Sequence, residues 1–146
     1  MAHVVDVLID GVRAGVSREA LGRLARQVLR AEQADEAFVS ITLLSDRAIT
    51  AVNRRHLGHA GPTDVISFAF REGPRLVGDI YIAPAVARSN ARTFGVGVRE
   101  ELARLVVHGT LHVLGWDHPD GAARTDSPMW RRQERLLARL WPVRST

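Results

Sequence analysis

Hydrophobic and polar positions along the chain follow two different periods. Short apolar or alternating runs, some of them rich in β-branched residues, predict four strands at residues 4–9, 37–44, 64–70 and 76–82. Helical periodicity and end signals predict five helices, at residues 18–33, 46–55, 84–94, 100–114 and from 128 to just before Pro142. The order of these elements predicts an α+β fold, in which a small mixed four-stranded sheet packs with about five helices.

The predicted helices begin at residues that favour helix ends. Ser17 is suited to cap the first helix, and Ser45 or Asp46 the second, because short polar side chains accept hydrogen bonds from unpaired backbone N–H groups. Pro84 and the pair Ser127-Pro128 are typical of the first positions of the third and last helices.

The helix predicted at 100–114 differs from the others because it is apolar on two sides. One face carries Leu102, Leu105, Val106, Gly109 and Val113, and a second face carries Val107, Leu111 and Leu114. A helix with this pattern is expected at the centre of the fold, with layers on both sides. Its remaining stripe carries His108 and His112 together with Glu101 and Arg104, and we expect this stripe to face a cleft. We interpret Glu101, two turns before His108, as a surface charge.

Residues 108–118 read HGTLHVLGWDH and contain the most informative spacing in the chain. His108 and His112 are four residues apart, so on a helix they lie on one face. Gly115 permits a sharp turn after the helix, and His118 can then return as a third nitrogen ligand. Three histidines with an open position are typical of a catalytic zinc site. The alternative, three ordinary core or surface histidines, requires three independent coincidences.

The same spacing occurs in metzincin peptidases, with one difference. Their general base is a Glu that follows the first histidine, and this chain has Gly109 there. A chain that keeps the ligands but lacks this base is a poor candidate for the peptidase mechanism. Asp117, next to His118, is interpreted either as a partner that orients an imidazole or as a turn residue.

Composition narrows the class of protein further. The 146 residues are expected to form a single domain, 1–146, and the absence of cysteine excludes disulfides and thiolate metal sites. Neither a membrane-spanning run nor a signal peptide is found, which predicts a cytoplasmic protein with no membrane partner. The net charge is +4 and every one of the 20 basic residues is arginine. This preference indicates either an RNA or phosphate partner or only a compositional bias.

Taken together, these motifs resemble the YbeY family of bacterial single-strand-specific endoribonucleases. The resemblance rests on HGTLHVLGWDH, on Pro-Thr-Asp-Val-Ile-Ser-Phe at 62–68, on Gly-Asp-Ile at 78–80, and on the segment from Met129 to Glu134. It implies one Zn²⁺ bound by His108, His112 and His118. It also implies action on single-stranded rRNA and the small ribosomal subunit, in 16S rRNA 3′-end maturation and ribosome quality control. Some members carry a cleavage-linked arginine where this chain has Leu57.

Further catalytic residues are predicted from chemistry alone. Arg54 or Arg55 could bind a non-bridging phosphate oxygen, or could lie at a solvated helix end, and His59 is a candidate acid or base. Two rival functions stay open: a metal-dependent hydrolase of another substrate, and a non-catalytic ribosome assembly factor with a structural zinc. An open metal position favours an enzyme, whereas a fourth protein ligand favours a structural site.

Overall fold

The computed structural model describes residues 2–58, 61 and 63–142. The strands are β1 (His3–Ile9), β2 (Ala37–Leu43), β3 (Val65–Glu72) and β4 (Arg75–Ile82). The helices are α1 (Arg18–Ala31), α2 (Asp46–Leu57), α3 (Pro84–Phe94), α4 (Val98–Val113) and α5 (Pro128–Leu140), with a 3₁₀ helix η1 (Gly121–Asp126) between α4 and α5. Ser17, Ser45 and Ser127 accept backbone hydrogen bonds at the starts of α1, α2 and α5, as predicted.

The four strands form one mixed sheet in the order β1-β2-β4-β3. β1, β2 and β4 are parallel, and β3 pairs with β4 in the antiparallel direction. This arrangement confirms the predicted α+β fold with a small mixed sheet and five α-helices. Antiparallel pairing of β3 and β4 is possible because a tight turn joins them, in which Gly73 has a φ of +60°.

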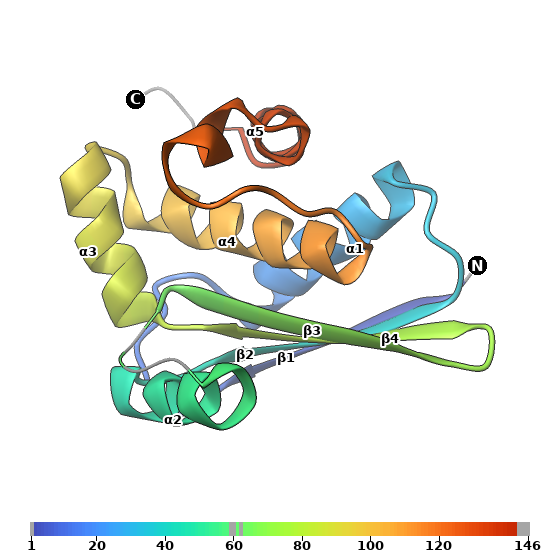
Figure 1. Cartoon of the computed structure of the whole chain (residues 1–146), viewed down its shortest axis with the longest axis horizontal. Helices are drawn as coiled ribbons and strands as arrows, with labels where there is room; N and C mark the ends of the chain where they lie inside the picture. Colours follow the sequence, from blue (N-terminus) through green and yellow to red (C-terminus); the bar gives the residue numbers. More distant parts are fainter. Residues whose placement is uncertain (1, 59–60, 62, 143–146) are drawn as a thin grey trace.

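Helices cover both faces of the sheet (Figure 1). α1 and α4 pack on one face over the main apolar core, and α5 lies on the outer side of α4. α2 lies on the opposite face, over a smaller cluster of Leu44, Ile49, Ile66 and Ala83. α4 is therefore enclosed between the sheet and α5, which confirms the prediction of a central buried helix.

Two glycines let α4 approach β4 closely. A Cβ atom on Gly109 of α4 would lie 2.7 Å from Cγ2 of Ile80, and one on Gly78 of β4 would lie 2.5 Å from Cγ1 of Val113. Both distances are shorter than real carbon contacts, so a larger side chain at either position would push the helix from the sheet. Gly109 occupies the position at which metzincin peptidases carry their catalytic Glu, and in this chain that position faces the apolar core.

Some details differ from the sequence prediction. η1 was not predicted, because a six-residue 3₁₀ helix without buried residues has no hydrophobic period to detect. β3 extends two residues beyond the predicted strand because it pairs with β4 up to Glu72. Within the described part of the chain, no helix is both long enough and apolar enough to cross a membrane.

Candidate metal centre

Three histidines converge at the C-terminal end of α4. His108 and His112 lie one turn apart on this helix, which ends at Val113. Gly115 adopts a φ of +102°, a conformation that favours glycine, and the chain turns back so that His118 faces the other two. One nitrogen from each ring lies within 4.8 Å of the others. The sequence-predicted set is therefore brought together in space.

The second nitrogen of each ring is held by an oxygen acceptor. Nδ1 of His112 lies 2.9 Å from the carbonyl oxygen of Trp116, and Nδ1 of His118 lies 3.0 Å from that of Pro119. Nδ1 of His108 lies 2.6 Å from Oε1 of Gln133. Because a carbonyl oxygen only accepts, each Nδ1 carries the proton and each Nε2 presents a lone pair. All three rings are thus in the tautomer that a metal requires at Nε2.

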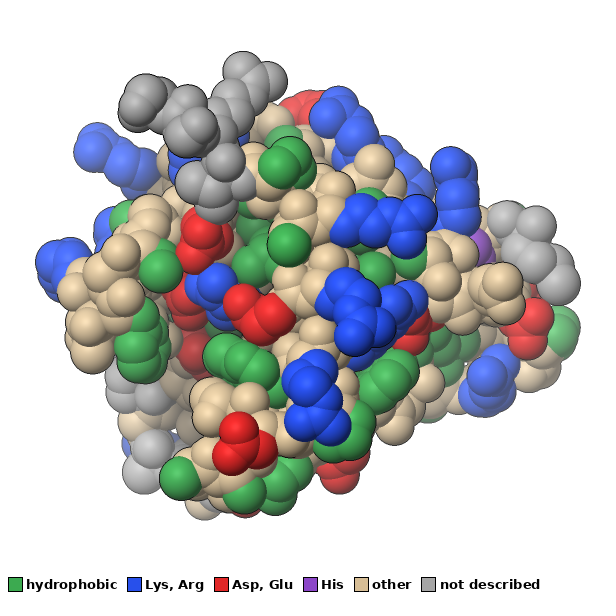
Figure 2. Space-filling view, turned by 90° about the horizontal axis from the view of Figure 1, so that it is seen from above, with side chains coloured by type: hydrophobic (Ala, Val, Ile, Leu, Met, Phe, Trp, Pro, Cys, Tyr) green, Lys and Arg blue, Asp and Glu red, His purple; other side chains and the backbone are tan. Residues whose placement is uncertain are grey.

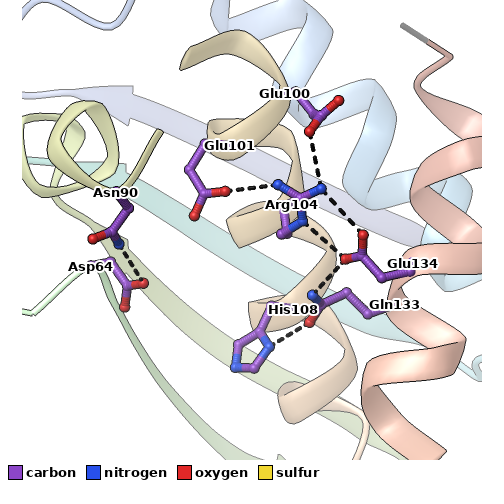
Figure 3. Close-up of polar contacts among 8 residues, drawn as sticks. All are labelled: Asp64, Asn90, Glu100, Glu101, Arg104, His108, Gln133 and Glu134. Carbon is purple, nitrogen blue, oxygen red and sulfur yellow. Dashed lines mark hydrogen bonds and ion pairs between the residues drawn. The ribbon is translucent and has the colours of Figure 1, made fainter. Parts of the chain in front are cut away.

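A chain of polar contacts between α4 and α5 fixes the Gln133 amide (Figure 3). Nε2 of Gln133 donates to Glu134 at 3.0 Å, which orients Oε1 toward His108. Glu134 in turn receives two hydrogen bonds from Arg104, which also pairs with Glu100 and Glu101. The orientation of His108 is therefore set by a network of polar contacts that extends one to two turns along α4, to Arg104, Glu101 and Glu100.

Glu101 is buried, not a surface charge, and this corrects the sequence interpretation. Only 5% of Glu101 is exposed, because α3 and α5 pack beside this part of α4 and Arg104 pairs with its carboxylate. Burial raises the pKa of Glu101, and the contact with Arg104 opposes this rise.

The site favours neutral imidazoles. Burial lowers the pKa of His108 to about 3, the hydrogen bond to Gln133 opposes this shift, and the positive charges of His112, Arg124 and His118 add to it. Burial followed by the charge of His118 lowers the pKa of His112 as well. Neutral rings are the form that binds a metal cation, so this environment fits the ligand role.

The donor set fits a divalent metal with an open coordination position. Among the described residues, the cluster contains three histidines and no fourth His, Asp, Glu or Cys ligand. His108 is buried, whereas His112 and His118 are half-exposed, so one side of the cluster faces solvent. Three neutral nitrogen ligands with an accessible fourth position are typical of catalytic rather than structural zinc sites.

The other predicted site residues lie elsewhere. Arg54 and Arg55 are exposed on α2, on the opposite face of the sheet from α4 (Figure 1). His59 lies outside the described residues. Asp117 accepts a hydrogen bond from the backbone N–H of the neighbouring residue His118 at 2.8 Å.

Sequence reasoning did not assign Gln133 or Arg124 to the site. Gln133 is buried with 1% exposure and touches His108 although 25 residues separate them. Arg124 lies on η1, beside the same histidine. The available signal for Gln133 was its polarity on the otherwise apolar inner face of a predicted helix.

The three-histidine cluster with an accessible fourth position fits a metal-dependent hydrolase. The family model described as Endoribonuclease YbeY matches residues 11–141. A relative from Moorella thermoacetica, named Endoribonuclease YbeY, is 41% identical over 139 residues, covering 84% of this chain and 88% of the relative. One of the same name from Pelotomaculum thermopropionicum is 40% identical over 129 residues, covering 82% and 84%. The chain belongs to the YbeY endoribonuclease family, which confirms the resemblance and the expected enzyme class.

A solved structure agrees with this assignment. The solution structure of TM1509 from Thermotoga maritima superposes with a TM-score of 0.66 at 28% identity, and the match covers 94% of this chain and 89% of that one. The shared architecture therefore extends over almost the whole chain.

Proposed function

We propose that this protein is a zinc-dependent endoribonuclease that cleaves single-stranded RNA in the cytoplasm. Its proposed role is the maturation of the 16S rRNA 3′ end and ribosome quality control, with the small ribosomal subunit as partner. The observation that carries this proposal is the convergence of three correctly oriented histidines at an accessible edge of α4, in a chain of the endoribonuclease family.

The ligand set supports zinc as the metal. His108, His112 and His118 present three imidazole nitrogens, the donors that Zn²⁺ prefers in catalytic sites with an open position. When bound, the ion would polarise a phosphoryl oxygen and lower the pKa of a water molecule toward neutrality. Because the three ligands are neutral, the ion would keep its full positive charge toward an anionic phosphate.

The protein's own residues supply position and orientation. Gln133, Trp116 and Pro119 hold the three Nδ1–H groups, so the rings do not need to reorganise when a ligand binds. We also retain Arg54 and Arg55 as proposed phosphate contacts and His59 as a proposed acid or base. An RNA strand would have to pass around the sheet edge for the two arginines on α2 to contact it.

The two rival functions are less well supported. Gly109 lies against Ile80 in the core, so the position of the peptidase base has neither the side chain nor access to the cleft. A structural zinc in a non-catalytic assembly factor would require a fourth protein ligand, and the described residues provide none.

The substrate class is tested with a labelled RNA that carries the precursor 3′ end of 16S rRNA. We expect cleavage of the single strand, and little cleavage when the same RNA is annealed to its complement. A denatured protein substrate is included to test the peptidase alternative. Equal cleavage of the duplex would contradict the single-strand specificity, and cleavage of the protein but not the RNA would contradict the function.

A further inference from the structure

A pocket of about 460 Å³ opens beside the metal centre. Its floor is α4, with Leu105 and His108, and its walls come from α3, α5, η1 and the segment before β3. Figure 3 shows Asp64 and Asn90 on one side of this space, with the α4 and α5 side chains on the other. The volume lies within the range of small-molecule sites and is large enough for one nucleoside.

Arg124 is the residue of this pocket whose hydrogen bonding is incomplete. Its Nε atom is buried and has no hydrogen-bond partner among the described residues. A buried donor without a partner is costly, and such atoms are uncommon in folded proteins. An acceptor oxygen supplied by a ligand in the pocket would complete the hydrogen bonding of this side chain.

The backbone of Arg124 is held firmly in place. Its carbonyl oxygen accepts hydrogen bonds from both the hydroxyl of Ser127, at 2.7 Å, and the backbone N–H of Ser127, at 3.2 Å. These contacts tie η1 to the first turn of α5, which also carries Trp130. The guanidinium is therefore presented from a fixed backbone position, which reduces the entropy lost on binding.

The charges around the pocket favour an anion at Arg124 rather than at Arg104. Arg104 already pairs with Glu100, Glu101 and Glu134 and has no charge left for a ligand. Arg124 makes no ion pair among the described residues, so its positive charge is not neutralised by a neighbouring carboxylate. Arg124 thus lines the same pocket as the candidate metal ligand His108, where a phosphate of the substrate is expected.

We propose that Arg124 is a substrate-binding residue that holds a backbone phosphate of single-stranded RNA, and that the adjoining pocket accepts the attached nucleoside. This inference rests on the proposed function of the site. The planar guanidinium matches phosphate oxygens, and Nε is one of the donors that a bidentate contact uses.

The remaining walls suit a nucleobase. Trp130 and the exposed Phe94 offer aromatic surface at the pocket, and base–aromatic stacking is a common contact for unpaired bases. Asp64 and Asn90, joined by a 3.2 Å hydrogen bond, add polar groups on the opposite wall. Figure 2 shows acidic, arginine and apolar side chains side by side on the α5 face of the molecule.

The test combines a protein variant with a change in the RNA. Arg124→Gln removes the charge, and Arg135→Gln, on the exposed side of α5, is the matched control. A set of single-stranded RNAs each carries one neutral methylphosphonate linkage, placed at successive positions around the cleaved bond. Binding to the metal-free proteins is measured by fluorescence anisotropy, and cleavage is measured with zinc present. Zinc affinity is determined for each variant.

We expect one methylphosphonate position to weaken binding to the wild type about ten-fold or more, and to have little further effect on Arg124→Gln. Removal of the base from the nucleotide that carries this phosphate, leaving an abasic site, should weaken wild-type binding as well. Zinc affinity should be unchanged or higher in Arg124→Gln, because a nearby positive charge has been removed.

Three results separate this inference from the proposed function. If the wild type cleaves RNA but Arg124→Gln binds and cleaves like Arg135→Gln, the inference is wrong and the function stands. If Arg124→Gln weakens binding equally for every modified RNA, with no position coupled to it, Arg124 does not hold a particular phosphate. Absence of metal-dependent cleavage by the wild type would contradict the function itself.

Discussion

Nδ1 of His108 donates a hydrogen bond to Oε1 of Gln133 across the interface of α4 and α5, at 2.6 Å. This contact joins a candidate metal ligand to the Arg104 network and fixes the ring tautomer. Removing the hydrogen-bond partner of a metal-binding histidine commonly lowers metal affinity 10- to 100-fold.

Gln133→Ala should therefore lower zinc affinity by about 10- to 100-fold. The reason is that the His108 ring loses the acceptor that holds its proton at Nδ1. Competition with a chromophoric chelator measures the affinity. Gln133→Glu is the comparison variant: it loses the donor to Glu134 but keeps an acceptor at the same reach toward His108, so it should retain more of the affinity than Gln133→Ala. Unchanged affinity in Gln133→Ala would show that the contact does not orient the ligand.

Metal removal should destabilise the protein. A ligand that binds only the folded state adds stability by mass action, about 2.7 kcal/mol when its free concentration is 100 times its Kd. Thermal unfolding of the wild type should therefore shift to lower temperature after dialysis against a chelator and recover with zinc. His118→Ala should lose this response, whereas His56→Ala, at an exposed position on α2, should keep it. A zinc-independent melting temperature in the wild type would oppose a metal site.

Acid should destabilise the metal-free protein over a defined range. The pKa of His108 is lowered from 6.5 to about 3 by folding, and that of His112 is also lowered. The unfolded chain therefore binds protons first, and the free energy of unfolding falls as the pH drops below about 6.5 toward 3. Each histidine contributes at most about 1.4 kcal/mol per pH unit.

Denaturant unfolding at a series of pH values measures this effect. His108→Asn removes one of the titrating groups, so its stability should depend less steeply on pH between about 6.5 and 5 than that of the wild type. Parallel profiles for the two proteins would mean that His108 is not held in its neutral form by the fold.

Gly109→Ala should destabilise the protein by about 1–3 kcal/mol, although alanine normally favours helices. The added Cβ would lie 2.7 Å from Cγ2 of Ile80, so the helix or the strand must shift. Gly97→Ala, at the N-cap of α4 with open space around the glycine, is the control; it introduces no clash and should cost only the smaller loss of a favoured N-cap residue. Chemical denaturation compares the two, and a neutral Gly109→Ala would show that α4 does not depend on this close approach.

The sequence alone predicted the structural features that depend on residues close together along the chain. All four strands, all five α-helices and the central position of α4 were predicted from hydrophobic period and capping residues. The three histidines were grouped because helical geometry and one glycine turn connect them within eleven residues. These are short-range relationships, so the structure reproduces them.

The features that were missed depend on how distant segments dock. Gln133 reaches His108 only because α5 packs on the outer side of α4, and Glu101 is buried by the same packing. Arg124 lies in a 3₁₀ helix without a hydrophobic pattern, so its place beside the histidines follows from tertiary structure alone. The predicted roles of Arg54, Arg55 and His59 stay predictions.

The most direct measurement compares RNA cleavage by the wild type, His112→Ala and His56→Ala, purified identically and assayed with a chelator or with added zinc. Circular dichroism confirms that each variant is folded, and the paired variants control for a contaminating ribonuclease. The account predicts zinc-dependent cleavage by the wild type and by His56→Ala, and loss of cleavage in a folded His112→Ala. Equal cleavage by all three proteins, or cleavage that persists in chelator, would contradict a metal-dependent endoribonuclease.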